Sequence, residues 1–195
     1  MIKAIVFDVD WVIVQSNQDK KKVITETLKQ YNVYWLPWVQ DILDLGLNRK
    51  PIFKKISEIH DFDADAALET MTQKSIIFES NPIPNLLVID FIKNNSNNYM
   101  CFTNTALPGT SLDRVIAWSG MWEYFKKHLS FDDGTKTQNV EYVLNNYNLK
   151  PEEVLFIDDN INHINIVSKN TWVHTFHFND YDLSIEDKIL EINSL

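Results

Sequence analysis

Residues 2–10 of the chain read IKAIVFDVD. A short apolar run that ends at a carboxylate is typical of a buried parallel strand, because such strands are covered on both faces. Asp8 and Asp10 follow this run, two residues apart. The stretch therefore predicts a central strand with two carboxylates at its carboxyl end.

Three more segments resemble this first strand, at residues 99–102, 154–157 and 172–176. Amphipathic helical patterns lie between or before them, at residues 86–93, 112–118, 140–147 and 162–168. Strands that alternate with helices indicate a parallel sheet with helices on both faces. We expect an α/β fold with a Rossmann-like parallel sheet core.

The stretch from residue 17 to residue 81 has a different character. Four helical windows occur there, at residues 21–31, 39–45, 52–59 and 64–78, and no segment has a convincing strand pattern. Pro82 and Pro84 follow and would stop any helix. We therefore predict a core made of residues 1–16 and 82–195, with an all-helical insertion at residues 17–81. An insertion after a strand lies where α/β sheets bind their ligands.

The overall charge excludes some classes of partner. The formal net charge is −9, which disfavours a surface that neutralises nucleic-acid phosphates or anionic lipid. No apolar run reaches the roughly 18 residues that a membrane span needs. Cys101 is the sole cysteine, so an intramolecular disulfide is excluded. We expect a cytoplasmic protein that binds neither nucleic acid nor membrane.

Polar residues end three of the expected strands. Asp8 and Asp10 follow the first, Thr-Asn at residues 103–104 ends the second, and Asp-Asp at residues 158–159 follows the next. The carboxyl ends of parallel strands meet in one crevice. Carboxylates gathered there would repel each other unless a cation neutralised them. A donor set of oxygen atoms without clustered cysteine or histidine suits Mg²⁺.

These motifs resemble those of the haloacid dehalogenase superfamily, on its phosphatase side. That superfamily has a strand ending in Asp-x-Asp, a second strand ending in Thr or Ser, a lysine before a helix, and an acidic pair after a later strand. Its helical insertion after the first motif is a C1-type cap, which residues 17–81 resemble. The matching residues here are Asp8 and Asp10, then Thr103 with Asn104, then Lys136, then Asp158 with Asp159.

The resemblance implies a role for each of these residues. Asp8 would attack phosphorus and carry an aspartyl-phosphate, and Asp10 would protonate the leaving oxygen and then activate water. The substrate phosphate would be held by Thr103, Asn104 and Lys136. The presence of Asp10 favours phosphoryl chemistry, because the dehalogenase branch lacks this second carboxylate.

The same resemblance implies a magnesium site. Asp8, Asp10 and Asp159 would bind Mg²⁺, and Asp158 would be either a fourth ligand or a neighbour that orients one. The implied enzyme is a Mg²⁺-dependent hydrolase of small phosphate monoesters, working as a monomer or a homodimer on a small phosphorylated metabolite.

Two positions depart from the superfamily's pattern. Trp11 stands where glycine is usual, which suggests a restricted or altered substrate pocket. Lys136 is followed by Thr137 and not by the common proline, so Lys126 or Lys127 remains an alternative for the motif lysine.

Two other functions remain open on the sequence alone. The same fold carries phosphomutases and phosphonate hydrolases, the latter with a cap lysine that forms a Schiff base. A catalytically silent binding module is the third possibility, and Trp11 is the residue that motivates it. A phosphatase assay with and without Mg²⁺ separates a silent module from an enzyme.

Overall fold

The computed structural model describes residues 1–34, 37, 49–179 and 184–194. The chain divides into two compact units. One joins Met1–Gln15 to Pro82–Leu195, and the other is Ser16–Asn81. None of the helices in the described ranges is both long and apolar enough to cross a membrane.

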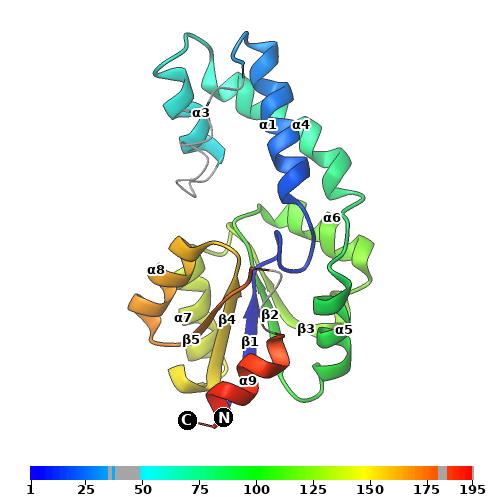
Figure 1. Ribbon diagram of the computed structural model, residues 1–195, viewed down its shortest axis with the longest axis vertical. Helices are drawn as coiled ribbons and strands as arrows, with labels where there is room; N and C mark the ends of the chain where they lie inside the picture. Colours follow the sequence, from blue (N-terminus) through cyan, green and yellow to red (C-terminus); the bar gives the residue numbers. More distant parts are fainter. Residues whose placement is uncertain (35–36, 38–48, 180–183, 195) are drawn as a thin grey trace. The chain divides into compact units, whose positions relative to one another are not determined.

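The first unit is built on a five-stranded parallel sheet, as the alternating pattern predicts (Figure 1). Its strand order is β3-β2-β1-β4-β5. The register aligns Phe7 of β1 with Thr103 of β2 and with Ile157 of β4, so the polar residues that follow lie at one edge. The strands are β1 (Ala4–Phe7), β2 (Met100–Asn104), β3 (Phe125–Leu129), β4 (Val154–Asp158) and β5 (His174–His177).

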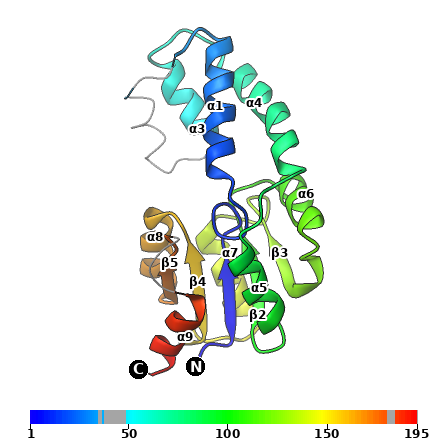
Figure 2. The same ribbon diagram turned by 45° about the vertical axis from the view of Figure 1, so that its right-hand side comes forward.

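Helices cover both faces of this sheet (Figure 1 and Figure 2). Side chains alternate along β1, so that Ile5 and Phe7 enter one core cluster while Ala4 and Val6 enter the other. The first cluster packs against α5 (Leu86–Asn95), α6 (Gly109–Ser119) and α9 (Ile185–Asn193). The second packs against α7 (Lys136–Asn146) and α8 (Ile161–Thr171). Two short 3-10 turns, η1 (Trp122–Tyr124) and η2 (Pro151–Glu153), precede β3 and β4.

The regular secondary structure in the described residues of the second unit is helical. It contains α1 (Asn17–Gln30), α3 (Arg49–Ser57) and α4 (Ala64–Glu79) around a separate apolar core that includes Leu28, Phe53 and Met71. These helices correspond to three of the four expected windows. The window at residues 39–45 lies outside the described residues. The α/β core with an inserted helical cap domain is the expected fold, and the residue boundaries of the domains stay a prediction.

The two connections to the second unit run side by side within the first. The backbone N–H of Gln15 donates to the carbonyl of Ile83 at 2.8 Å, and that of Asn85 donates to the carbonyl of Ile13 at 2.9 Å. Val14 and Pro84 form an antiparallel bridge between the same segments. The chain therefore leaves and re-enters the core at neighbouring points.

Candidate active site

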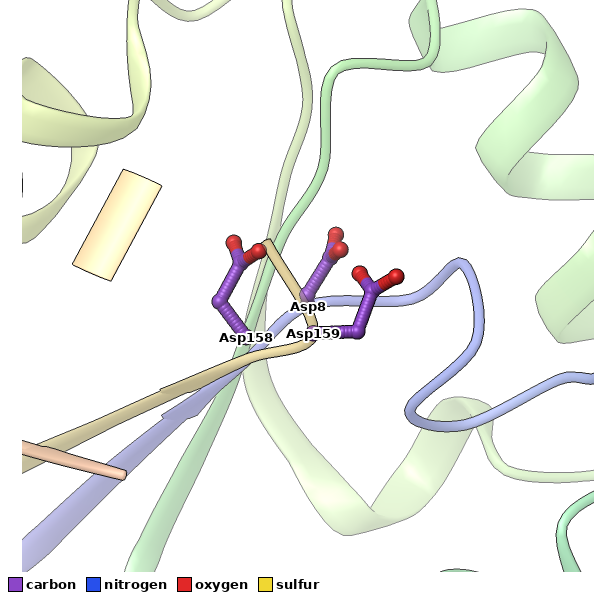
Figure 3. A group of neighbouring side chains, drawn as sticks. All are labelled: Asp8, Asp158 and Asp159. Atoms are coloured by element: carbon purple, nitrogen blue, oxygen red, sulfur yellow. The ribbon is translucent and has the colours of Figure 1, made fainter. Parts of the chain in front are cut away.

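Three carboxylates converge at the carboxyl edge of the sheet (Figure 3). Asp8 follows β1, Asp158 ends β4 and Asp159 comes next in the chain. Each offers one oxygen, and these oxygens lie within 4.8 Å of one another. Asp158 is fully buried and Asp8 is 4% exposed. The ends of these strands therefore lie close together, as the sequence predicts.

Asp8 is fixed by the backbone on both sides. Its N–H donates to the carbonyl of Ile157 at 2.8 Å, and its Oδ1 accepts the N–H of Val9 at 2.8 Å. Lys136 Nζ lies 2.7 Å from the same Oδ1. Burial raises the pKa of Asp8 well above its usual value, more than the Lys136 charge can offset. The charge of Lys136 therefore does not fully offset the cost of burying a negative charge on Asp8.

Asp10 adds further negative charge near Asp8. Its negative charge contributes to the raised pKa of Asp8, as do the charges of Asp158 and Asp159. Asp10 is partly buried, and a bridge to Val14 fixes its backbone. The structure thus brings Asp8, Asp158 and Asp159 together, while Asp10 lies near enough for its charge to act on Asp8.

Both oxygens of Asp158 already have partners. Oδ2 lies 2.5 Å from Lys136 Nζ, while Oδ1 accepts the N–H of Asn160 at 2.8 Å and lies 3.2 Å from Nδ1 of His163. Burial alone would raise the pKa of Asp158, but Lys136 and His163 outweigh it, and the pKa is lowered. Asp158 is therefore stable as a carboxylate beside Lys136.

Lys136 is the lysine that the fold brings to the site. Its ammonium bridges Asp8 and Asp158, whose attraction outweighs burial and raises the lysine pKa to about 12. Neither alternative makes this contact. Lys126 is exposed on the edge strand β3, and Lys127 lies 3.9 Å from Asp133 and over the ring of Tyr142.

The start of α7 places Lys136. Thr135 caps the helix, because its hydroxyl accepts the N–H of Gln138 at 3.3 Å while the Gln138 side chain accepts the N–H of Thr135 at 2.8 Å. Lys136 is the first helical residue. The capped helix start thus places Lys136 next to the carboxyl ends of the strands.

Asn104 supports the same turn from the strand side. Its Nδ2 donates to the carbonyl of Lys136 at 2.9 Å, and its Oδ1 accepts from Nδ2 of Asn139 at 3.0 Å. Asn139 also donates to the carbonyl of Ser130 at 3.0 Å. Both side-chain groups of Asn104 are thus engaged in holding α7, and its role in phosphate binding stays a prediction.

Thr103 is likewise engaged. It is fully buried, and its hydroxyl oxygen accepts the N–H of Leu129 at 3.0 Å across the β2–β3 pair. Its phosphate-binding role stays a prediction.

Two residues at the site were missed by the sequence analysis, Asn139 and His163. The Thr-x-x-Gln pattern at residues 135–138 is a sequence signal that could have located the start of α7, but no signal in the sequence indicates the pairing of Asn139 with Asn104. His163 stands five residues after Asp158 and is the third residue of α8, so it lies in the first turn of the helix that follows β4.

The charges and donor atoms fit a hard divalent cation. Four carboxylates influence this group, and Lys136 contacts two of them, Asp8 and Asp158. A cation bound by oxygen atoms of Asp8 and Asp159 would supply the missing positive charge. The donor set holds oxygen only, as Mg²⁺ prefers.

The family model described as haloacid dehalogenase-like hydrolase matches residues 5–177. The chain therefore belongs to the haloacid dehalogenase-like hydrolases, in agreement with the resemblance of its motifs. No curated protein matches the chain significantly.

Several solved structures share the fold at low sequence identity. A haloacid dehalogenase-like family hydrolase from Streptococcus pneumoniae has a TM-score of 0.77 and 16% identity, over 98% of this chain and 90% of that one. A protein assigned as a phosphoglycolate phosphatase from Lactobacillus plantarum has a TM-score of 0.70 and 16% identity, over 90% and 86%. The HAD-hydrolase YfnB from Bacillus subtilis, solved with bound magnesium, has a TM-score of 0.73 and 14% identity, over 98% and 99%.

Proposed function

We propose that this hydrolase cleaves small phosphate monoesters in a Mg²⁺-dependent reaction through an aspartyl-phosphate on Asp8. One observation carries the proposal. Lys136 bridges Asp8 and Asp158 with its ammonium 2.7 and 2.5 Å from their oxygens, at the edge where Asp159 also lies. A buried carboxylate held beside a cation and a metal-ligand set suits attack on a dianionic phosphate, whose charge would otherwise repel the nucleophile.

The proposed reaction has two steps. In the first, an oxygen of Asp8 forms a bond to phosphorus, the ester P–O bond breaks, and Asp10 gives its proton to the leaving oxygen. In the second, Asp10 takes a proton from water, the water oxygen attacks phosphorus, and inorganic phosphate leaves Asp8. Lys136 offsets the charge on Asp8 and on the phosphoryl oxygens in both steps.

We propose Asp8, Asp10 and Asp159 as the magnesium ligands, Asp8 and Asp159 through their carboxylates and Asp10 through its backbone carbonyl, so that the Asp10 carboxyl group can carry the proton. When bound, Mg²⁺ would neutralise charge on the carboxylates and on the phosphoryl group. Asp158 fits a different task, because Lys136, Asn160 and His163 occupy its two oxygens. It would hold Lys136 in place and keep it charged.

An assay of phosphate release tests this function. The purified protein, supplied with Mg²⁺ and a panel of phosphorylated sugars, nucleotides and acids together with p-nitrophenyl phosphate, should release phosphate from at least one of them. Exhaustive EDTA treatment should abolish the release, and returning Mg²⁺ should restore it. Activity undiminished by EDTA would overturn the metal dependence, and inactivity on the whole panel with Mg²⁺ would favour a silent binding module.

A further inference from the structure

Trp11 has a backbone conformation that bulky residues rarely adopt. Its φ is +67°, in the left-handed region. Among the described non-glycine residues only three others share this sign, namely Asn32, Asn148 and Trp172. Asparagine tolerates the left-handed region, so the two tryptophans are the unusual cases.

The turn around Trp11 is tightly determined. Its N–H donates to the carbonyl of Val14 at 2.6 Å, while the N–H groups of Ile13 and Val14 both donate to the carbonyl of Val9. Val9, Val12, Ile13 and Val14 are fully buried in the main core cluster. These bonds and this packing fix the backbone at Trp11.

Trp11 differs from its neighbours in this turn. Trp11 is half-buried and belongs neither to the core cluster nor to the partly buried side chains that pack against it. Trp11 is therefore set apart from its fully buried neighbours, and its backbone conformation is one that glycine adopts more readily. Backbone strain of this kind is often found at functional sites.

Trp11 follows Asp10 and stands three residues after Asp8. We propose that Trp11 is a specificity-determining residue, whose indole lines the leaving-group side of the phosphate site and favours esters with a flat apolar leaving group. This inference rests on the proposed function. Asp10 must reach the ester oxygen to protonate it, so its neighbour lies within range of whatever that oxygen carries. A flat ring stacks well on an indole, whereas a small hydroxylated chain does not.

The test compares the kcat/KM for phenyl phosphate with that for glycerol 3-phosphate in each variant. Trp11→Gly should lower this ratio by about tenfold, the lower end of what a lost aromatic stacking contact costs. Trp11→Phe should keep most of the ratio. Trp172→Gly is the matched control, because Trp172 has a φ of +61° at the exposed C-cap of α8. It should leave the ratio unchanged.

The thermal unfolding temperature distinguishes a specificity role of Trp11 from a packing role, because loss of a packing residue would lower it. Trp11→Gly and Trp172→Gly should both unfold at or above the wild-type temperature, because glycine relieves the same backbone conformation in each. An unchanged ratio in Trp11→Gly would overturn the proposal. A large fall in its unfolding temperature would also overturn it, because the indole would then be a packing residue.

A binding measurement distinguishes failure of the proposed phosphatase function from failure of the inference about Trp11. Wild-type protein that hydrolyses neither ester contradicts the phosphatase function. Calorimetric binding of the two esters to Asp8→Asn, with and without Trp11→Gly, then decides the role of Trp11. A selective loss of phenyl phosphate binding supports it, whereas equal binding in both proteins, or no binding by either, overturns it.

Discussion

Asp8 and Asp158 share one lysine, yet their environments favour opposite protonation states. Burial dominates at Asp8 and raises its pKa, while Lys136 and His163 outweigh burial at Asp158 and lower its pKa. Asp8 makes fewer charge-assisted contacts than Asp158, whose two oxygens both accept hydrogen bonds. Asp8, the candidate nucleophile, is thus the carboxylate whose negative charge the surrounding protein offsets less fully.

This contrast predicts opposite effects of the same substitution on stability. In metal-free protein at neutral pH, Asp8→Asn should raise the free energy of unfolding, since it removes a buried charge that the fold disfavours. Asp158→Asn should lower it by roughly 3 kcal/mol, because a buried ion pair loses one partner. Urea unfolding of the two variants and the wild type measures both changes. A loss of stability in Asp8→Asn would contradict the account.

The pH dependence follows from the same pKa shifts. Because the pKa of Asp8 is raised on folding, the folded protein binds a proton in the range between the unfolded and folded values, and stability falls as the pH rises through that range. For Asp158 the pKa is lowered, so its contribution is present above the unfolded value and is lost as the pH falls through the folded value. The increase in the free energy of unfolding of Asp8→Asn over the wild type should therefore be largest at neutral pH and smallest in acid.

At the scale of elements, the first turn of α7 is held from three directions. Thr135 caps the helix, Asn104 accepts from Asn139 and donates to the Lys136 carbonyl, and Asn139 reaches the carbonyl of Ser130. Asn139 is 1% exposed. Its side chain therefore joins β2 and the β3–α7 loop to the helix that bears the site lysine.

Asn139→Ala should loosen this turn. Leaving the partners of Asn139 unsatisfied should cost roughly 1–3 kcal/mol of stability. It should also reduce kcat for p-nitrophenyl phosphate by about tenfold, since a small displacement of a catalytic cation is costly. The matched control is Asn146→Ala at the exposed end of α7, where Asn146 donates only to the carbonyl of Tyr142. Equal activity per folded molecule in the two variants would show that Asn139 does not position Lys136.

The elements differ in how well the sequence predicts them. β1 and β4 are buried on both faces, so their apolar runs stand out. β3 reads FKKHL and lies at the edge of the sheet, where exposed positions admit lysine, and its pattern is too polar to be recognised. α9 was also missed. The contact of Asn104 with Asn139 joins residues 35 apart, and no local pattern encodes such a distance.

At the scale of the whole molecule, the family defines the chemistry and the inserted helical unit is the proposed source of selectivity. Its connections to the core are paired through Gln15 and Ile83, so the two cut ends lie close together. A short flexible linker can therefore replace residues 17–81 without stretching the core. The insertion also has an apolar core of its own.

Such a truncated protein should retain a cooperative unfolding transition and its far-ultraviolet helical and sheet signals. Its selectivity among phosphorylated substrates should fall, because closure of a cap excludes water and completes a site. Rates on the substrate panel, compared between truncated and full-length protein, measure this change. An unchanged ranking of substrates would contradict the assignment of residues 17–81 as the selective cap.

The central claim is that Asp8 carries the phosphoryl group and Asp10 transfers protons. Asp10→Asn keeps the nucleophile and should lose turnover by roughly 10²–10⁴-fold. With p-nitrophenyl phosphate, whose leaving group needs little protonation, it should give a burst of nitrophenolate followed by slow turnover. Quench-flow coupled to mass spectrometry of the protein is the decisive measurement. We expect a trapped phosphate on Asp8. Phosphate on another residue, or near-wild-type turnover by Asp8→Asn, would overturn the proposed mechanism.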